Sequence, residues 1–294
     1  MTAHTSRSLE TLIAFCNDGA RFAVLTGAGC STDSGIPDYR DANGNWKHAK
    51  PVMYQDFMAN PSVRQRYWAR SMLGWPRMAG AKPGAAHDAL ARMQAIGLVR
   101  QLITQNVDGL HQRAGSEGVI DLHGRLDEVR CQQCDTLMPR ADWQALIAEL
   151  NPRWFDKVAS VRDAPDGDAI IDNANYESFV VAPCPRCGGI VKPEVVFFGE
   201  SVPKQRVDDS YNAIEQSDAL LVAGSSLMVF SGFRFARRCH ELGKPLFILN
   251  QGKTRADELT DLKIDAGCGE TLQRIVAAVQ NDPATATRID TRTQ

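Results

Sequence analysis

Short runs of apolar residues recur along the chain, and several of them end abruptly at glycine or at small polar residues. Such runs occupy residues 22–25, 102–103, 219–223 and 246–249. Short apolar runs bounded by turn-forming residues are typical of strands that are buried on both faces. Between the runs, apolar residues recur at helical spacing, as in residues 9–16. This alternation predicts an α/β fold, a Rossmann-like parallel sheet with helices on both faces.

Polar residues directly follow these runs and predict where a site would lie. Gly27, Asn106, Ser225 and Asn250 each stand just beyond one of them. Because the carboxyl ends of parallel strands meet at one edge of a sheet, we expect these four residues around a single crevice. The apolar run at residues 195–198 is expected to add another strand to the same part of the protein.

The stretch that contains Asn106 and Asp108, followed by His123, carries the candidate catalytic chemistry. At neutral pH an imidazole is well suited to exchange a proton, and an amide or carboxylate nearby can orient a water or a ribose hydroxyl. Each residue taken alone could also be an ordinary polar loop residue.

The first strand runs into Gly27, Ala28 and Gly29, a turn that suggests phosphate binding. Glycines there let backbone amides approach a pyrophosphate. The third glycine of the dinucleotide fingerprint is missing, since Thr occupies position 32. Residues 34–40 are expected to continue as a loop rich in groups that can contact a nucleotide.

Four of the eight cysteines form two Cys-x-x-Cys pairs, which predict a zinc site. The pairs are Cys131 with Cys134 and Cys184 with Cys187. Four thiolates fill a tetrahedral shell and leave no position for water, so the ion should be structural. The long separation of the pairs predicts that the metal closes the base of a sizeable insertion.

Residues 47–82 are aromatic and irregularly helical, and predict a small cap beside the sheet. Tyr67 and Arg70 stand three residues apart on one helical face, where they could hold a carboxylate together. Without further context, a packed tyrosine beside a solvated arginine is the simpler interpretation.

Length and composition suit one large domain with a smaller module attached. The chain has 294 residues, 44% of them hydrophobic, and a net charge of −2, which gives no electrostatic argument for nucleic-acid or membrane binding. We expect no membrane span and no secretion signal, and hence a cytoplasmic, bacterial protein. The expected division is a Rossmann-like part at about 8–46, 83–129 and 193–280, a helical cap at 47–82, a zinc insertion at 130–192 and a disordered tail at 281–294.

Together these motifs resemble those of the sirtuin family, in the family's order, over about residues 9–275. They are GAGCS (27–31), GIPDYR (35–40), TQNVD (104–108), LHG (122–124), the two Cys-x-x-Cys pairs, KPEVVFFG (192–199) and GSS (224–226). The separation of the cysteine pairs and residues 64–76 are similar to the class II branch, which includes a mitochondrial lipoamidase and ADP-ribosyltransferase. Cys30 departs from the apolar residue that is commoner at its position.

The resemblance implies NAD-dependent removal of acyl groups from lysine, with the acyl group passed to ADP-ribose and nicotinamide released. It implies His123 as general base, with Asn106 and Asp108 also catalytic. The implied NAD-binding residues are Gly27, Ala28, Gly29, Ser31, Asp38, Tyr39, Arg40, Gln105, Asn106, Asp108, Gly224, Ser225, Ser226, Asn250, Gln251, Gly252 and Cys268, the last beside the adenine. Acyl-lysine proteins are the expected partners, bound as an added strand beside Phe198, Gly199 and Glu200.

The resemblance also changes the interpretation of Tyr67 and Arg70. A Tyr-x-x-Arg pair is similar to the one by which the desuccinylase branch holds acidic acyl chains, so we expect long or acidic acyl groups, such as lipoyl or glutaryl-type chains, to be preferred over acetyl. Two alternatives stay open, a mono-ADP-ribosyltransferase that uses the same NAD pocket and a non-enzymatic NAD sensor.

Overall fold

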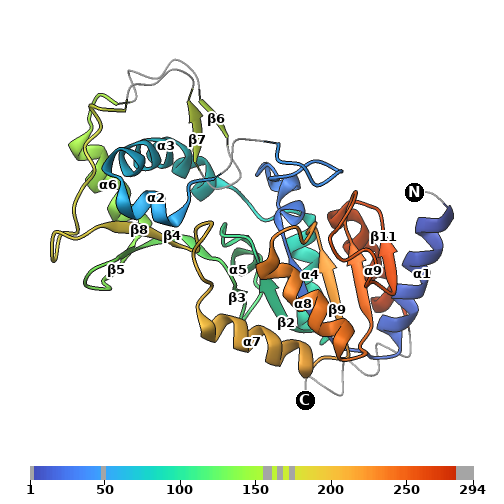
Figure 1. Ribbon diagram of the computed structural model, residues 1–294. Coiled ribbons are helices and arrows are strands. Elements are labelled where there is room, and N and C mark those ends of the chain that lie inside the picture. The colour runs from blue at the N-terminus through green and yellow to red at the C-terminus, as the bar shows by residue number, and fades with distance from the viewer. Residues whose placement is uncertain (1–2, 48–50, 155–160, 164–167, 172–175, 283–294) are drawn as a thin grey trace.

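The computed structural model describes residues 3–47, 51–154, 161–163, 168–171 and 176–282, which form two lobes (Figure 1). The larger lobe contains a six-stranded parallel sheet with the strand order β11-β10-β9-β1-β2-β3. Its strands are β1 (Phe22–Thr26), β2 (Val99–Thr104), β3 (Ile120–Asp121), β9 (Ala219–Ala223), β10 (Leu246–Leu249) and β11 (Leu262–Ile264). The predicted apolar runs are therefore strands of one parallel sheet, and the predicted fold class is confirmed.

Helices cover both faces of this sheet. One face carries α1 (Ala3–Asn17), α4 (Ala85–Ala95) and α9 (Cys268–Gln280), and the other carries α7 (Lys204–Glu215) and α8 (Phe230–Glu241). Along β1, Phe22 and Val24 pack into the first core, whereas Ala23 and Leu25 pack into the second. Because both faces are buried, the strand has no polar alternation, which is why it appears in the sequence as a continuous apolar run.

The strand order reverses between β1 and β9, which lie side by side although far apart in sequence. In doubly wound sheets the crevice at such a switch point is where ligands bind. The loops that leave the two strands touch there, since the Gly29 amide donates to the Gly224 carbonyl at 2.8 Å. The topology thus brings the predicted phosphate loop to the binding edge.

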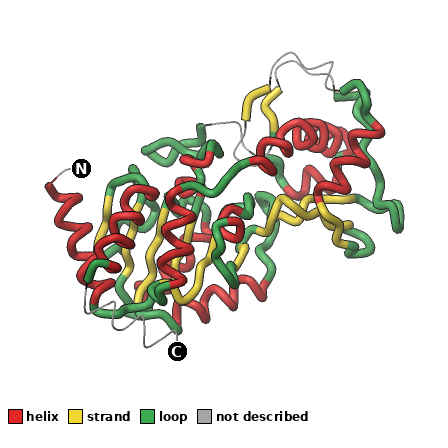
Figure 2. Tube along the Cα trace, turned by 180° about the vertical axis from the view of Figure 1, so that it is seen from behind, coloured by secondary structure: helices red, strands yellow, loops and turns green. Residues whose placement is uncertain are grey.

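The smaller lobe joins the predicted cap to the cysteine-bearing insertion (Figure 2). It contains α2 (Tyr54–Ala59), α3 (Pro61–Gly80), α6 (Arg140–Leu150), the hairpin β6 (Val161–Asp163) and β7 (Ala169–Ile171), and an antiparallel sheet of β4 (Gly124–Cys131), β5 (Leu137–Pro139) and β8 (Val191–Val195). Trp68 from α3 packs against Trp143 from α6, with ring centroids 5.2 Å apart and the ring planes tilted by 55°. Cap and insertion therefore share one hydrophobic core.

One expectation about the sheet is wrong. The apolar run at residues 195–198 is predicted to be a strand of the Rossmann-like part, but the strand is β8 (Val191–Val195), which contains only the first residue of that run. It pairs antiparallel with β4 in the smaller lobe. A buried apolar run predicts a strand without indicating its partner, and here the partner is the strand that leads into the first cysteine pair. The exact domain boundaries stay predictions.

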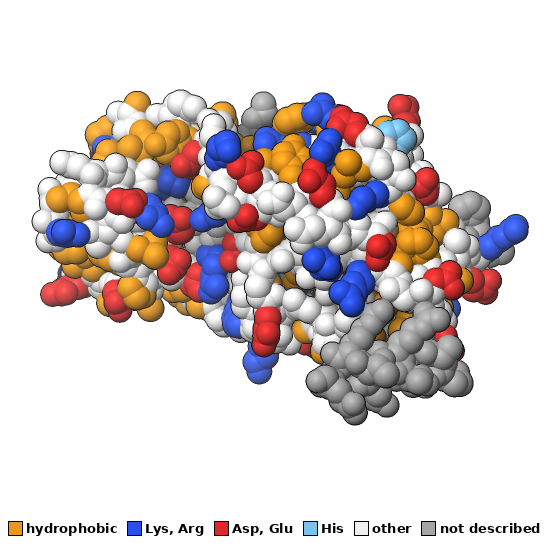
Figure 3. All heavy atoms as spheres, turned by 90° about the horizontal axis from the view of Figure 1, so that it is seen from below, with side chains coloured by type: hydrophobic (Ala, Val, Ile, Leu, Met, Phe, Trp, Pro, Cys, Tyr) orange, Lys and Arg blue, Asp and Glu red, His pale blue; other side chains and the backbone are white. Residues whose placement is uncertain are grey.

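Two further expectations concern the surface and the chain end. Among the described helices, none is long and apolar enough to cross a bilayer. On the face seen in Figure 3, basic and acidic side chains are interspersed, in keeping with the small net charge. Helix α9 ends at Gln280, and the tail expected to be disordered lies outside the described residues from position 283 onward.

Candidate active site

A cavity of about 720 Å³ opens at the carboxyl ends of β1, β2 and β9 and is lined by residues of both lobes. Most of the predicted site residues line it. They are Gly27, Ala28, Gly29, Ser31, Asp38, Tyr39, Arg40, Tyr67, Gln105, Asn106, Asp108, His123, Phe198, Gly199, Glu200, Gly224, Ser225, Ser226, Asn250 and Gln251. Segments that lie far apart in the sequence thus converge on one space large enough for a dinucleotide and part of a second substrate.

Three of the residues predicted to contact NAD or the acyl group do not line this cavity. Gly252 turns the chain at φ +78°, and its amide donates to Asp265. Cys268 is buried at the start of α9, where its thiol faces the Leu249 carbonyl. Arg70 points elsewhere, as described below.

The glycines of the first loop are required by close contact with the loop after β9. A Cβ added at Gly27 would lie 2.8 Å from the Gly224 carbonyl oxygen, and one at Gly29 would lie 2.9 Å from the Gly224 Cα. Ser225 lies at the same junction and accepts a hydrogen bond from the Gln105 side chain at 2.8 Å. Two short 3-10 turns, at residues 28–30 and 32–34, replace a long crossover helix, as the sequence predicted. Because Gly27 and Gly29 have no side chain, the backbone amides of this loop can approach a phosphate closely.

A polar network holds Asn106 and Asp108 at the inner end of the cavity. The Asn106 amide donates to the Gly27 carbonyl and to the Ser31 hydroxyl, both at 3.0 Å. Ser31 in turn donates to Asp108 at 2.7 Å. The other Asp108 oxygen accepts the backbone amide of Leu110 at 2.8 Å. The protein's own groups therefore hold both catalytic candidates in place, as in a preorganised site.

Two histidines that the sequence analysis did not select lie beneath this network. His87 accepts the Gly84 amide on Nδ1, so the proton sits on Nε2, which donates to Ser31 at 3.3 Å. His111 lies 2.9 Å from the Thr26 hydroxyl, and burial lowers its pKa to about 3. Both rings are therefore neutral and support the network instead of exchanging protons with a ligand. No local motif marks them, since they meet only through tertiary packing.

His123 has the geometry of a general base. Its Nδ1 lies 3.0 Å from the Gln105 carbonyl, which can only accept, so Nδ1 carries the proton. Its Nε2 therefore presents a lone pair, to which Ser231 donates at 2.8 Å. Burial, with smaller contributions from the charges of Arg206 and Arg234, lowers the pKa of His123 to about 4. The ring is neutral at pH 7 with its basic nitrogen toward the cavity.

The structure separates Tyr67 from Arg70. Tyr67 is buried, lines the cavity and packs edge-on against Phe57. The Arg70 Nε donates to the Ala169 carbonyl at 2.7 Å, and its Nη2 lies 3.8 Å from Asp168. The arginine is thus directed to the β7 hairpin, and the pair does not converge on the cavity.

The proposed substrate edge at residues 198–200 is partly occupied by the protein itself. The Phe198 carbonyl accepts the Tyr54 amide, and the Gly199 carbonyl accepts the Gln55 side chain, both at 2.9 Å. The Glu200 carboxylate is held by the Phe197 amide at 2.8 Å and by Lys192 at 3.1 Å. An added strand would have to displace the Gln55 side chain to use the Gly199 carbonyl.

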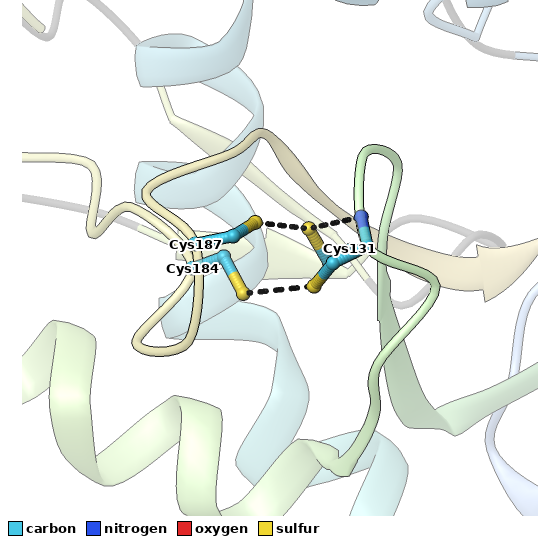
Figure 4. Close-up of side chains that lie close together, drawn as sticks. Cys131, Cys184 and Cys187 are labelled. Atoms are coloured by element: carbon cyan, nitrogen blue, oxygen red, sulfur yellow. Dashed lines mark hydrogen bonds between the residues drawn. The ribbon is translucent and has the colours of Figure 1, made fainter.

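The four predicted cysteine ligands converge in the smaller lobe, away from the cavity lining (Figure 4). Their sulfur atoms all lie within 4.8 Å of one another, with Cys131 and Cys187 at 3.5 Å and Cys134 and Cys184 at 3.8 Å. Tetrahedral zinc with Zn–S bonds near 2.3 Å places its sulfur ligands about 3.8 Å apart. Backbone amides of residues 133 and 134 point at the Cys131 sulfur, as expected for a thiolate. The arrangement fits one tetrahedral zinc ion.

The fold and the cavity define a doubly wound α/β protein with a dinucleotide-type crevice and a cysteine-bearing second lobe. A model of the Sir2 family matches residues 27–231. A Xanthomonas axonopodis pv. citri protein named NAD-dependent protein deacetylase is 54% identical over 272 residues, covering 92% of each chain. A protein of the same name from Bordetella bronchiseptica is 53% identical, covering 92% of this chain and 97% of that one.

Solved structures agree with the sequence relatives. A complex described as "Sir2-p53 peptide-NAD+" is 30% identical with a TM-score of 0.70, covering 94% of this chain and 98% of that chain. A second structure, described as "Structural Basis for the Mechanism and Regulation of Sir2 Enzymes", is 29% identical with the same TM-score and covers 95% and 99%. The chain belongs to the Sir2 family, the sirtuins.

Proposed function

We propose that the protein is an NAD-dependent lysine deacylase. The observation that carries this proposal is the presence, in one cavity, of a glycine loop open to phosphate and a neutral histidine whose basic Nε2 faces the same space. Relatives above 50% identity named NAD-dependent protein deacetylase support it, as does the likeness to a Sir2 complex with peptide and NAD+.

NAD fits the residues of the nucleotide side. The bare backbone of residues 27–29 and the Ser225 region would hold the phosphates, and Asn250 and Gln251 would hold the adenosine ribose. When bound, NAD supplies a ribose that loses nicotinamide and accepts the acyl group. Asn106 and Asp108, already fixed by Ser31 and Leu110, would line the nicotinamide side of the pocket.

His123 would act as the general base. Its Nε2 would take the proton of a ribose hydroxyl, which would replace Ser231 as the hydrogen-bond partner. Because burial keeps the ring neutral at pH 7, no proton has to leave before it can accept one. The Gln105 carbonyl would stabilise the resulting imidazolium through Nδ1.

The acyl-lysine peptide would bind as a strand beside residues 198–200. Backbone hydrogen bonds would supply affinity with little demand on sequence. The zinc ion held by the four cysteines would be structural, because its shell has no open position for a reacting group.

For the acyl group we propose a preference for long chains over acetyl. Tyr67, Met78, Leu126 and Phe197 line the cavity, so a long acyl chain would be surrounded by apolar side chains. The further idea that acidic chains bind requires Arg70 to leave the Ala169 carbonyl, so it depends on a rearrangement. Membership of the class II branch and a cytoplasmic location are proposed on the sequence features alone.

The test is a panel of acetyl-, octanoyl-, lipoyl- and glutaryl-lysine peptides incubated with and without NAD and analysed by mass spectrometry. We expect NAD-dependent loss of acyl groups, with long chains removed faster than acetyl. Radiolabel from NAD retained on protein, without deacylation, would favour the mono-ADP-ribosyltransferase instead. NAD binding without any turnover would favour the sensor.

A further inference from the structure

An exposed aromatic residue stands at the start of α8, at the edge of the cavity. Phe230 is 44% exposed and its neighbour Val229 is 36% exposed, and both line the cavity. Helix α8 lies on the side of the large lobe nearer the small lobe (Figure 1). Large apolar side chains left exposed beside a functional cavity are a common mark of a contact surface.

Three arginines surround this phenylalanine. The guanidinium carbons of Arg234, Arg237 and Arg255 lie 5.1, 5.4 and 5.9 Å from the centroid of the Phe230 ring. Arg255 also lies 4.5 Å above the ring of Phe233. A guanidinium group that lies over an aromatic ring keeps its N–H donors, which lie in the plane of the guanidinium group, available for other partners. We call Phe230 with these three arginines the arginine rim.

The protein neutralises little of this positive charge. Arg237 makes one exposed ion pair with Glu241 at 3.4 Å, and Arg255 donates to the Met228 carbonyl at 3.4 Å. Within the described residues, Arg234 has no ion pair or hydrogen bond, and its Nε is buried without a partner. Arg234 also lines the cavity, and its charge contributes to the lowered pKa of His123. A cation in such a position favours an anionic ligand group.

We propose that the arginine rim binds acidic side chains that flank the acylated lysine in protein substrates. The inference rests on the proposed deacylase function. Phe230, Arg234 and the proposed substrate edge at residues 198–200 line the same cavity, and Ser231, which follows Phe230, donates to the His123 Nε2 at 2.8 Å. A peptide whose lysine reaches His123 would therefore come close to Phe230 and Arg234. Arg237 and Arg255 stand beside the Phe230 ring outside the cavity lining, where residues that flank the lysine could meet them. Aspartate and glutamate carboxylates match the planar donors of arginine, and the exposed ring offers a surface for their aliphatic carbons.

The experiment compares acetyl-lysine peptides that differ only in the two residues on each side of the lysine, which are Glu, Gln or Lys. Exposed charge pairs are individually weak, so we expect kcat/KM for the Glu peptide to exceed that for the Gln peptide by about fivefold, with the Lys peptide slowest. The preference should shrink as salt is raised from 25 to 300 mM. Placing glutamates on one side at a time locates the contact.

Arg234→Gln and Arg255→Gln should each bring the ratio of Glu to Gln peptide toward one. Arg238→Gln is the matched control, because Arg238 lies on the same helix but pairs with Glu215 at 2.6 Å, and it should keep the wild-type ratio. Equal kcat/KM for the Glu and Gln peptides in the wild type would overturn the proposal, and so would an equal loss of the ratio in Arg238→Gln.

A binding measurement separates this proposal from the proposed function. Fluorescence anisotropy of the labelled peptides gives Kd whether or not they are turned over. If no peptide is deacylated but the Glu peptide binds about fivefold tighter than the Gln peptide, binding of acidic residues by the arginine rim is supported and the proposed deacylase function fails. If the Gln peptide is deacylated and flanking charge changes neither Kd nor kcat/KM, the deacylase stands and the rim proposal fails.

Discussion

The two walls of the cavity are held in different ways. On the wall from the large lobe, Asn106, Ser31 and Asp108 form a chain of hydrogen bonds just beyond the carboxyl ends of β1 and β2. On the wall from the small lobe, Tyr67 is held by aromatic packing, and the Gly199 carbonyl accepts a hydrogen bond from the Gln55 side chain. Hydrogen-bonded polar groups in fixed positions suit a ligand that is the same in every reaction cycle, as a cofactor is. A wall of apolar side chains, with one hydrogen bond that a peptide could replace, suits substrates that differ from one another.

The largest expected effect tests what holds the small-lobe wall in place. Cys184→Ser removes one of four thiolates, and structural zinc sites contribute on the order of 10 kcal/mol in small modules. We expect loss of bound zinc, a much lower Tm and early unfolding of the small lobe, measured by metal analysis and calorimetry. Cys16→Ala is the control and should keep one zinc per chain. A wild-type protein without zinc would show that something else holds this lobe.

The next effect concerns the junction of the two walls. His123→Ala should lower kcat for deacylation by about 10²- to 10⁴-fold, because a positioned general base contributes that much. NAD affinity and zinc content should be retained, as the change leaves both scaffolds intact. Wild-type turnover by a folded His123→Ala protein would refute the assignment of the base.

Adding a methyl group at Gly29, in the glycine loop of the large lobe, should lower the affinity for NAD. In Gly29→Ala the new Cβ would meet the Gly224 Cα at 2.9 Å, and overpacking of this kind costs about 1–3 kcal/mol. We expect NAD affinity to fall about tenfold or more by calorimetry, with a smaller effect on peptide binding. Gly80→Ala is the matched control, because a Cβ there has nothing within 4 Å. Equal affinities in the two variants would show that the glycine loop does not hold the nucleotide.

Acid should lower the stability of the fold through His111, which is buried, and His123, which is partly buried. The pKa of His123 is lowered from 6.5 to about 4 and that of His111 to about 3, both mainly by burial. The unfolded chain therefore binds more protons between pH 6.5 and 4, so the free energy of unfolding should fall as pH falls through this window. Chemical denaturation at pH 7, 6 and 5 measures the effect, and His123→Ala should reduce the pH dependence while leaving the part that His111 contributes. A free energy of unfolding that is constant from pH 7 to 5 in the wild type would contradict the assignment of both rings as neutral in the folded protein.

The smallest effect distinguishes the two views of Arg70. If Arg70 leaves the Ala169 carbonyl to bind acidic acyl chains, Arg70→Ala should lower kcat/KM for glutaryl-lysine by about tenfold while sparing octanoyl-lysine. If it stays at the β7 hairpin, as in the present arrangement, losses on the two substrates should be equal and small. The ratio of the two kcat/KM values, before and after the change, is the measurement.

The two walls also differ in how much the sequence predicts. Gly27, Asn106 and Ser225 directly follow apolar strands, so parallel topology alone places them together. The cysteine spacing likewise indicates its own site. By contrast, three features depend on how the two lobes and α8 pack, which local sequence does not show. They are the pairing of β8 with β4, the direction of the Arg70 side chain, and the hydrogen bond between Ser231 and His123. Helical spacing shows that Tyr67 and Arg70 share a face, but not which of them points into a cavity.

The central claim is that the wall from the large lobe binds NAD and the wall from the small lobe binds the acyl-lysine peptide for one coupled reaction. The most direct measurement therefore follows nicotinamide and free lysine in the same sample. Wild-type protein, NAD and an acyl-lysine peptide should give one nicotinamide per lysine freed, with nicotinamide release lower by an order of magnitude or more when the peptide is left out. Release of nicotinamide that does not depend on the peptide, or deacylation that proceeds without NAD, would contradict the account.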